Sequence, residues 1–159
     1  MNFRVLQYRG RSLVSLAIRF QTRSLYSHSA IMDLDNGETY EAWHRGGVLL
    51  SPDPFAAHSR RTYIDVFSIK GGYDAQLLRH FLDNQLGKKY DFLAVARFLT
   101  RRRARDNTKW FCSELVAAAF NHAGLDLLNP RAHHALLSPR DIGLSPHLRY
   151  RRTIDNAGE

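Results

Sequence analysis

The chain contains a single cysteine, Cys112, and eight histidines, so its candidate chemistry is that of one thiol and a choice of bases. Cys112 lies in the segment WFCSELV, and the spacing of Leu115 and Val116 predicts that it opens a helix with an inward apolar face. Unpaired N–H groups at a helix N-terminus stabilise a thiolate, so this position favours a lowered thiol pKa and a nucleophile. The alternative is a buried core cysteine.

Eight histidines offer more bases than the sequence can choose between. His28 opens a predicted strand and shares a face with Ala30 and Met32, which fits either a general base or a satisfied core residue. The adjacent pair His133 and His134 has no acidic or thiolate cluster beside it, so we read both as loop residues and predict no metal site. The remaining histidines have no sequence context that assigns them a role: His44, His58, His80, His122 and His147.

The charge balance favours an anionic partner. Lysine and arginine number 23 and aspartate and glutamate 15, which gives a net charge of +8, and arginine supplies most of the positive charge. Guanidinium groups bind carboxylate and phosphate in bidentate fashion. The run Arg101, Arg102, Arg103 and Arg105 lies just before the thiol and is predicted to steer an anionic substrate toward it. A solvated basic face is the alternative interpretation.

The pattern of elements predicts an α+β fold in one domain spanning residues 1–159. A cysteine count of one excludes an intrachain disulfide and a multi-thiolate zinc site, and no linker divides the chain. Alternating or β-branched segments predict strands, 3.6-residue periodicity predicts helices, and the proline-containing tail predicts loops and turns. The expected strands are 3–8, 28–34, 39–43, 48–50 and 63–69, and the expected helices are 12–22, 77–86, 91–99 and 112–120, with 130–159 as the tail.

A hairpin is predicted at Asn36-Gly37, because this pair accepts the positive φ angles of a two-residue turn. In that register paired residue numbers sum to 73, so Glu41 shares a sheet face with His28, but His28 itself faces Arg45. Four residues along a strand is roughly 13 Å, too far for a hydrogen bond in a regular ladder. A bulge, a longer loop or strong twist must shorten that distance if Glu41 is to contact His28.

Four segments together resemble the permuted branch of the NlpC-type papain-like peptidases, which includes YiiX-like proteins and relatives of lecithin–retinol acyltransferase. They are SHSAIM from Ser27, TYEA from Thr39, LGKKYDF from Leu86 and WFCSELV from Trp110. In that branch the histidine precedes the cysteine along the chain, as it does here. The resemblance covers roughly residues 24–125 and implies a permuted papain-like fold, with a small antiparallel sheet packed against helices.

The resemblance also implies roles for particular residues. Cys112 matches the nucleophile, His28 the general base and Glu41 the third polar position, while Tyr26 is a candidate for the oxyanion site. Backbone N–H groups, including that of Cys112, would make up most of the oxyanion hole. The family resemblance implies no metal and no organic cofactor.

The leading prediction is therefore a cysteine hydrolase that cleaves an amide through an acyl-enzyme, with cell-wall (peptidoglycan) peptides as the first candidate substrate. The rivals are an acyltransferase or lipid amidase or esterase of the same fold, and a non-catalytic basic binding module associated with a phage or with nucleic acid, of which nucleic acid is the less favoured partner. The apolar run 13–18 is too short for a membrane span and lacks a signal-peptide cleavage site, so we expect a protein made in the cytoplasm, with later export or phage-mediated release.

Overall fold

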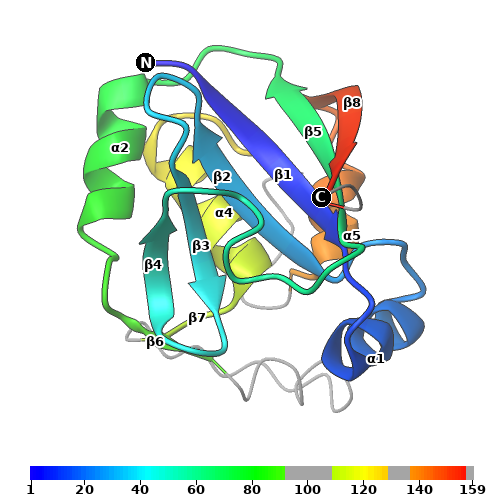
Figure 1. Ribbon diagram of the computed structural model, residues 1–159. Helices are drawn as coiled ribbons and strands as arrows, with labels where there is room; N and C mark the ends of the chain where they lie inside the picture. Colours follow the sequence, from blue (N-terminus) through cyan, green and yellow to red (C-terminus); the bar gives the residue numbers. More distant parts are fainter. Residues whose placement is uncertain (92–108, 129–136, 157–159) are drawn as a thin grey trace.

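A six-stranded antiparallel sheet forms the centre of the protein in the computed structural model, which describes residues 1–91, 109–128 and 137–156 (Figure 1). Its strand order is β4-β3-β2-β1-β5-β8. The strands are β1 (Phe3–Arg9), β2 (His28–Asp33), β3 (Thr39–Trp43), β4 (Gly47–Ser51), β5 (Tyr63–Ile69) and β8 (Leu148–Asp155); β6 (Lys89–Tyr90) and β7 (Lys109–Trp110) form a separate parallel pair. The helices are α1 (Leu13–Thr22), α2 (Ala75–Asp83), α4 (Cys112–His122) and α5 (Pro139–Gly143).

The two faces of the sheet bury different sets of side chains. Alternate residues of β1 and β2, such as Val5 and Ile31, point toward α2 and α4 and form the larger core. Leu6 and Ala30 point to the other face, which the chain between β4 and β5 covers with Phe55. The sequence prediction of α+β is confirmed, whereas the permuted papain-like arrangement and the single domain stay predictions.

The hairpin between β2 and β3 differs from the predicted register. The pairs Ile31–Tyr40 and Met32–Thr39 sum to 71, so the loop has four residues and Gly37, with φ of 75°, is its last residue. The carboxylate of Asp33 accepts the backbone N–H of Asp35, which favours this longer turn. The prediction of a two-residue turn is therefore wrong by two positions in register.

The corrected register brings Glu41 two residues closer to the row of His28. With a sum of 71, His28 faces Trp43, and Glu41 becomes a diagonal neighbour on the same face. Diagonal neighbours are within reach of long side chains. The paired residues stop at Ile31 and Tyr40, so side chains rather than backbone hydrogen bonds join β2 to β3 at the His28 end.

The predicted tail of loops contains an eight-residue strand, and that prediction is wrong. β8 pairs with β5 along its full length and forms one edge of the sheet. Its sequence LRYRRTID lacks alternation because most of its side chains are exposed. Charged, exposed edge strands are common because they resist pairing with another chain.

Helix α1 has the predicted position, but its apolar stripe faces solvent instead of the core. Ser12 caps it, with its hydroxyl accepting the backbone N–H of Ser15 at 3.2 Å. Ile18 is its buried residue, whereas Leu13 and Phe20 are 87% and 89% exposed. The helix lies beyond one end of the sheet (Figure 1).

Other predictions concern residues without a described position. The predicted helix 91–99 and the cluster Arg101, Arg102, Arg103 and Arg105 fall outside the described residues, apart from Asp91. Among the helices of residues 1–91, 109–128 and 137–156, none combines the length and apolar character that crossing a membrane requires.

Candidate functional site

Cys112 is the first residue of α4, as the sequence predicted. The backbone of Phe111 provides the N-cap, and the Glu114 carboxylate accepts the Phe111 N–H at 3.3 Å. The thiol is 1% exposed and packs with Phe111 and Tyr90. Helix α4 crosses the sheet over β2 and β3, so Cys112 lies against the end of β2 that begins at His28.

The protonation state of Cys112 differs from the prediction. Burial raises the pKa of the Cys112 thiol to about 12, and the nearby charge of Glu114 acts in the same direction. Hydrogen bonding from the backbone of Ser29 and Ser113 lowers the pKa but does not outweigh burial. The expectation that the helix N-terminus alone would lower the thiol pKa is therefore wrong, because desolvation of the charged form is the larger effect.

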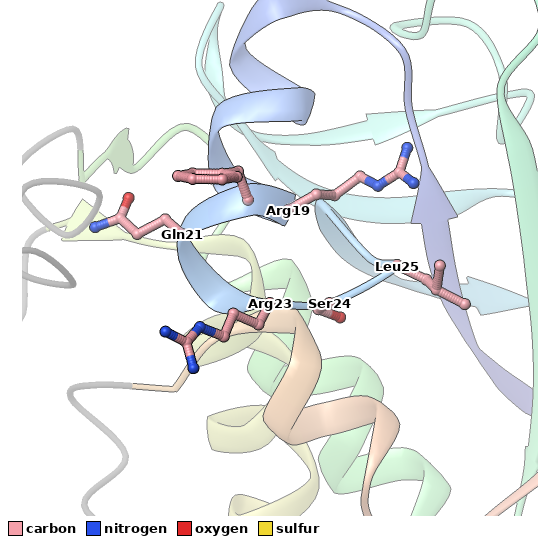
Figure 2. A pocket seen from close by; sticks show the side chains of 6 residues that line it. Arg19, Gln21, Arg23, Ser24 and Leu25 are labelled. Atoms are coloured by element: carbon pink, nitrogen blue, oxygen red, sulfur yellow. The ribbon is translucent and has the colours of Figure 1, made fainter.

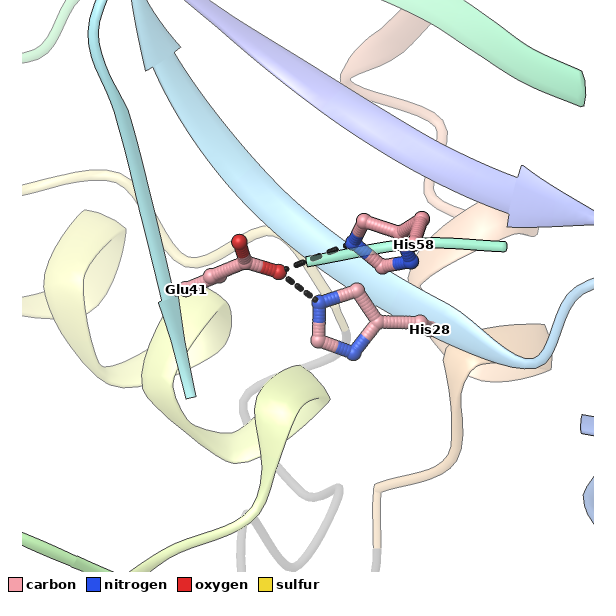
Figure 3. Close-up of side chains that lie close together, drawn as sticks. All are labelled: His28, Glu41 and His58. Atoms are coloured by element: carbon pink, nitrogen blue, oxygen red, sulfur yellow. Dashed lines mark hydrogen bonds and ion pairs between the residues drawn. The ribbon is translucent and has the colours of Figure 1, made fainter. Parts of the chain in front are cut away.

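His28 and Glu41 form a direct contact. The Nε2 atom of His28 lies 2.9 Å from Oε2 of Glu41, and both side chains are buried (Figure 3). Nδ1 lies on the side of the ring away from Glu41 (Figure 3), and no hydrogen bond within the described residues engages it. The ring is thus oriented at one nitrogen and available for proton transfer at the other.

Glu41 accepts three hydrogen bonds, which makes it the centre of the cluster. His58 Nε2 lies 3.0 Å from the same oxygen, Oε2, and the Ser51 hydroxyl donates to Oε1 at 3.0 Å. Burial raises the pKa of Glu41, but hydrogen bonds and charge from His28 and His58 outweigh it and lower the pKa to about 2. Glu41 is therefore a carboxylate throughout the physiological pH range.

His28 is held in its neutral form. Burial lowers the pKa of His28, and although Glu41 opposes this shift, it does not reverse it. Tyr8 and Trp43 pack edge-on against the imidazole, with ring centroids at 5.0 and 5.1 Å. A neutral imidazole, oriented by a carboxylate and enclosed by aromatic rings, can accept a proton.

A cavity of about 620 Å³ opens onto His28 and His58. Its wall includes Trp43, residues of α1 and Tyr90. Tyr90 also packs against Cys112, so one aromatic side chain contacts both the thiol and the cavity. The cavity is large enough for a peptide side chain or an acyl group beside the base.

The structure does not join the Cys112 thiol directly to the His28 imidazole. No hydrogen bond among the described residues connects Cys112 to His28. Register places His28 on the sheet face of Ala30, whereas α4 packs on the opposite face against Ile31. Since His28 is the first residue of β2, where backbone pairing with β3 has ended, a proton path between them would pass around the end of the strand.

Tyr26 lies away from this cavity. Its hydroxyl donates to Oδ2 of Asp65 at 3.0 Å, and its ring packs edge-on against Phe67. Burial and the charge of Asp65 raise the pKa of Tyr26 to about 12. Tyr26, the candidate for the oxyanion site, thus has its hydroxyl engaged by the Asp65 carboxylate in this structure.

His58 belongs to this cluster, although its sequence context assigns it no role. It lies in the connection between β4 and β5, where no periodicity marks which side chains turn inward. Its ring stacks on Tyr8 with centroids 4.1 Å apart. The Glu41 side chain extends from β3 toward the His58 ring (Figure 3). Only the sequence-distant contact with Glu41 assigns it to the site.

His28, Glu41 and His58 also fit the requirements of a transition-metal site. Their ligand atoms lie within 4.8 Å of one another. Two imidazoles and one carboxylate, with the cavity as an open position, form the donor set typical of catalytic zinc. Ser51, bonded to the second carboxylate oxygen, would orient the ligand from the outer shell.

Comparison with known proteins identifies the fold. No family model matches the chain, and a search of curated proteins gives no match. Among solved structures, the metalloprotein YiiX from Escherichia coli O157:H7, a DUF1105 protein, superposes with a TM-score of 0.73 over 98% of each chain, at 21% identity. The chain has a YiiX-like fold. At this identity the YiiX likeness extends to the fold and not to the activity.

Proposed function

We propose that the protein is a cysteine hydrolase of the permuted papain-like type, in which Cys112 is the nucleophile, His28 the general base and Glu41 its orienting partner. The observation that carries this proposal is the buried His28–Glu41 pair at 2.9 Å, at the end of β2 where the backbone of Ser29 interacts with the thiol. Cleavage of an amide in a cell-wall peptide is the first candidate reaction.

The protonation states define how such a hydrolase would work. Cys112 rests as a thiol and His28 as a neutral imidazole, so the pair does not start as a thiolate–imidazolium ion pair. We infer that Nδ1 of His28 takes the thiol proton as the sulfur attacks the substrate carbonyl, and that Glu41 stabilises the imidazolium that forms. The imidazolium then gives this proton to the leaving amine.

Water completes the cycle. His28, neutral again, accepts a proton from water, whose oxygen attacks the thioester carbonyl; the C–S bond breaks, the acid product leaves and the proton returns to the sulfur. The backbone N–H groups of Ser29 and Ser113, which favour the thiolate, supply electrostatic stabilisation near the reacting sulfur.

The test of this proposal uses two substrate classes side by side. The metal-free protein is incubated with peptidoglycan fragments and, separately, with acyl-lipid amides and esters, and free amines and fatty acids are measured. Product release from one substrate class that disappears in Cys112→Ala supports the thiol mechanism and identifies that class as the substrate. Release that persists in Cys112→Ala contradicts it.

A metal-dependent hydrolase is the second candidate, favoured by the His28–Glu41–His58 cluster and by the description of the YiiX structure as a metalloprotein. The three residues would hold a divalent ion of the zinc class, which when bound lowers the pKa of a water molecule. In this reading Cys112 is a core residue, and His28 serves as a ligand rather than a base.

Metal analysis separates the two candidates. We would measure zinc stoichiometry and affinity by competition with a chromophoric chelator, in the wild type, His58→Gln and His44→Gln. His44 lines the same cavity outside the cluster and is the matched control. One equivalent of zinc lost only in His58→Gln, with activity that survives Cys112→Ala, supports the metal enzyme. Absence of zinc binding contradicts it.

A further inference from the structure

Helix α1 carries its apolar stripe on the outside of the protein. Leu13, Leu16, Ala17 and Phe20 follow the i, i+3, i+4, i+7 spacing that places side chains on one helical face. This face normally packs into a core, but here Leu13 is 87%, Leu16 47% and Phe20 89% exposed. The opposite face, with Ile18, is the one turned toward the protein.

The surroundings of this stripe are cationic. Arg11, Arg19 and Arg23 lie on α1 or next to its ends, and the first acidic residue of the chain is Asp33. Arg19 and Arg23 also line an open hollow of about 660 Å³ together with Phe20 and Leu25, which is 60% exposed (Figure 2). Arg23 is exposed beside the apolar side chains, whereas Arg19 is half-buried and donates to the Gly10 carbonyl at 3.2 Å.

We propose that α1 docks the protein onto an anionic phospholipid surface, with Leu13, Leu16 and Phe20 entering the acyl-chain boundary and Arg11 and Arg23 contacting lipid phosphates. Amphipathic helices with large apolar residues on one face and arginine beside them bind membrane interfaces in this way. Anionic lipid adds an attraction that a neutral membrane lacks. A nucleic acid would use the arginines but leave the aliphatic stripe in water.

Docking at α1 would place the candidate site close to the membrane. Val14 and Ile18 of α1 line the cavity that opens onto His28 and His58. A substrate that belongs to a lipid, or to polymer attached to a membrane, would meet the cavity beside the docked helix. This consequence depends on the proposed hydrolase; the docking itself does not.

Vesicle binding tests the proposal without any measure of activity. The wild type is centrifuged with vesicles of phosphatidylcholine alone and with vesicles containing anionic phosphatidylglycerol. We expect clear preference for the anionic vesicles, and weaker binding as salt rises. The double variant Leu13→Ser, Phe20→Ser should bind vesicles at least about tenfold more weakly than the wild type. The double variant Arg11→Gln, Arg23→Gln should lose most of the preference for anionic lipid.

A matched control and a probe keep these outcomes distinct. Leu144→Ser removes an apolar side chain that is 68% exposed but lies outside α1, and it should leave vesicle binding unchanged. In a Cys112→Ser background, a polarity-sensitive fluorophore attached through Phe20→Cys should shift to the blue only when anionic vesicles are added. A blue-shifted probe before lipid addition, which another part of the chain or a second copy would cause, overturns the proposal, as does equal binding by the serine double variant.

Discussion

The two halves of the candidate catalytic site are prepared to different degrees. The base half is assembled: His28, Glu41 and His58 come from three separate segments and meet at 2.9 and 3.0 Å around one carboxylate oxygen. The thiol half is not ionised, because Cys112 is buried and its pKa is raised to about 12. In the proposed hydrolase, the base would be preorganised, and the nucleophile would ionise only when the proton is removed during reaction.

Removal of the His28 imidazole should reduce the rate of hydrolysis more than any other change to the base half of the site. His28→Ala removes the group proposed to accept the thiol proton, and since the thiol does not ionise by itself, we expect hydrolysis to fall by roughly 10³-fold. The measurement is kcat/KM on the substrate that the wild type cleaves, in metal-free buffer. A matched His44→Ala variant should retain activity. A loss of less than about tenfold would mean that His28 is not the base.

Neutralising the carboxylate should have the next largest effect. Glu41→Gln keeps the shape of the side chain but cannot stabilise an imidazolium at His28, so we expect kcat to fall about 10²-fold with KM little changed. Circular dichroism and thermal unfolding serve as controls for folding. An unchanged kcat in a folded variant would reduce Glu41 to a structural anchor for the two histidines.

The rate of Cys112 alkylation reports directly how much of the thiol is ionised. Reaction with iodoacetamide follows the thiolate fraction, and the thiolate form is favoured only as pH rises toward the raised pKa of about 12. The folded protein should thus react slowly at pH 8, about tenfold faster for each unit of pH above it, and rapidly at pH 8 once unfolded in guanidinium. Fast alkylation of the folded protein at pH 7 would restore the original expectation of a lowered thiol pKa.

His58 should show the smallest effect on hydrolysis. His58→Gln removes one of three donors to Glu41 but leaves the bond from His28, so we expect kcat to change by less than about threefold. The same variant should lose any zinc binding. A loss of activity as large as that of His28→Ala would show that the histidines act together, as metal ligands do.

The sequence predicted local features of this protein better than its long-range contacts. Cys112 at a helix start, β3 at Thr39–Trp43 and the position of α1 follow from capping and periodicity, which depend on neighbouring residues. The register of the β2–β3 hairpin depended on whether Gly37 ends a two- or a four-residue loop, and Asn36-Gly37 alone favoured the shorter one.

Contacts that depend on tertiary structure were beyond the sequence. His58 has no periodic neighbour, and only the fold of the β4–β5 connection brings it to Glu41. The apolar spacing of α1 and α4 is alike, yet α4 buries Leu115 and Phe120 while α1 exposes Phe20. Periodicity identifies an apolar face but does not say whether protein or another surface covers it.

The most direct test of Cys112 as a nucleophile is intact-mass measurement of the protein after brief reaction with peptidoglycan fragments and with acyl lipids. A thiol nucleophile predicts a covalent adduct on Cys112, of peptide or fatty-acyl mass, that accumulates when substrate is in excess. It should be removed by hydroxylamine, form more slowly in His28→Ala and be absent in Cys112→Ala. Turnover of either substrate with no adduct at any time, and with the same rate in Cys112→Ala, would contradict a thiol nucleophile.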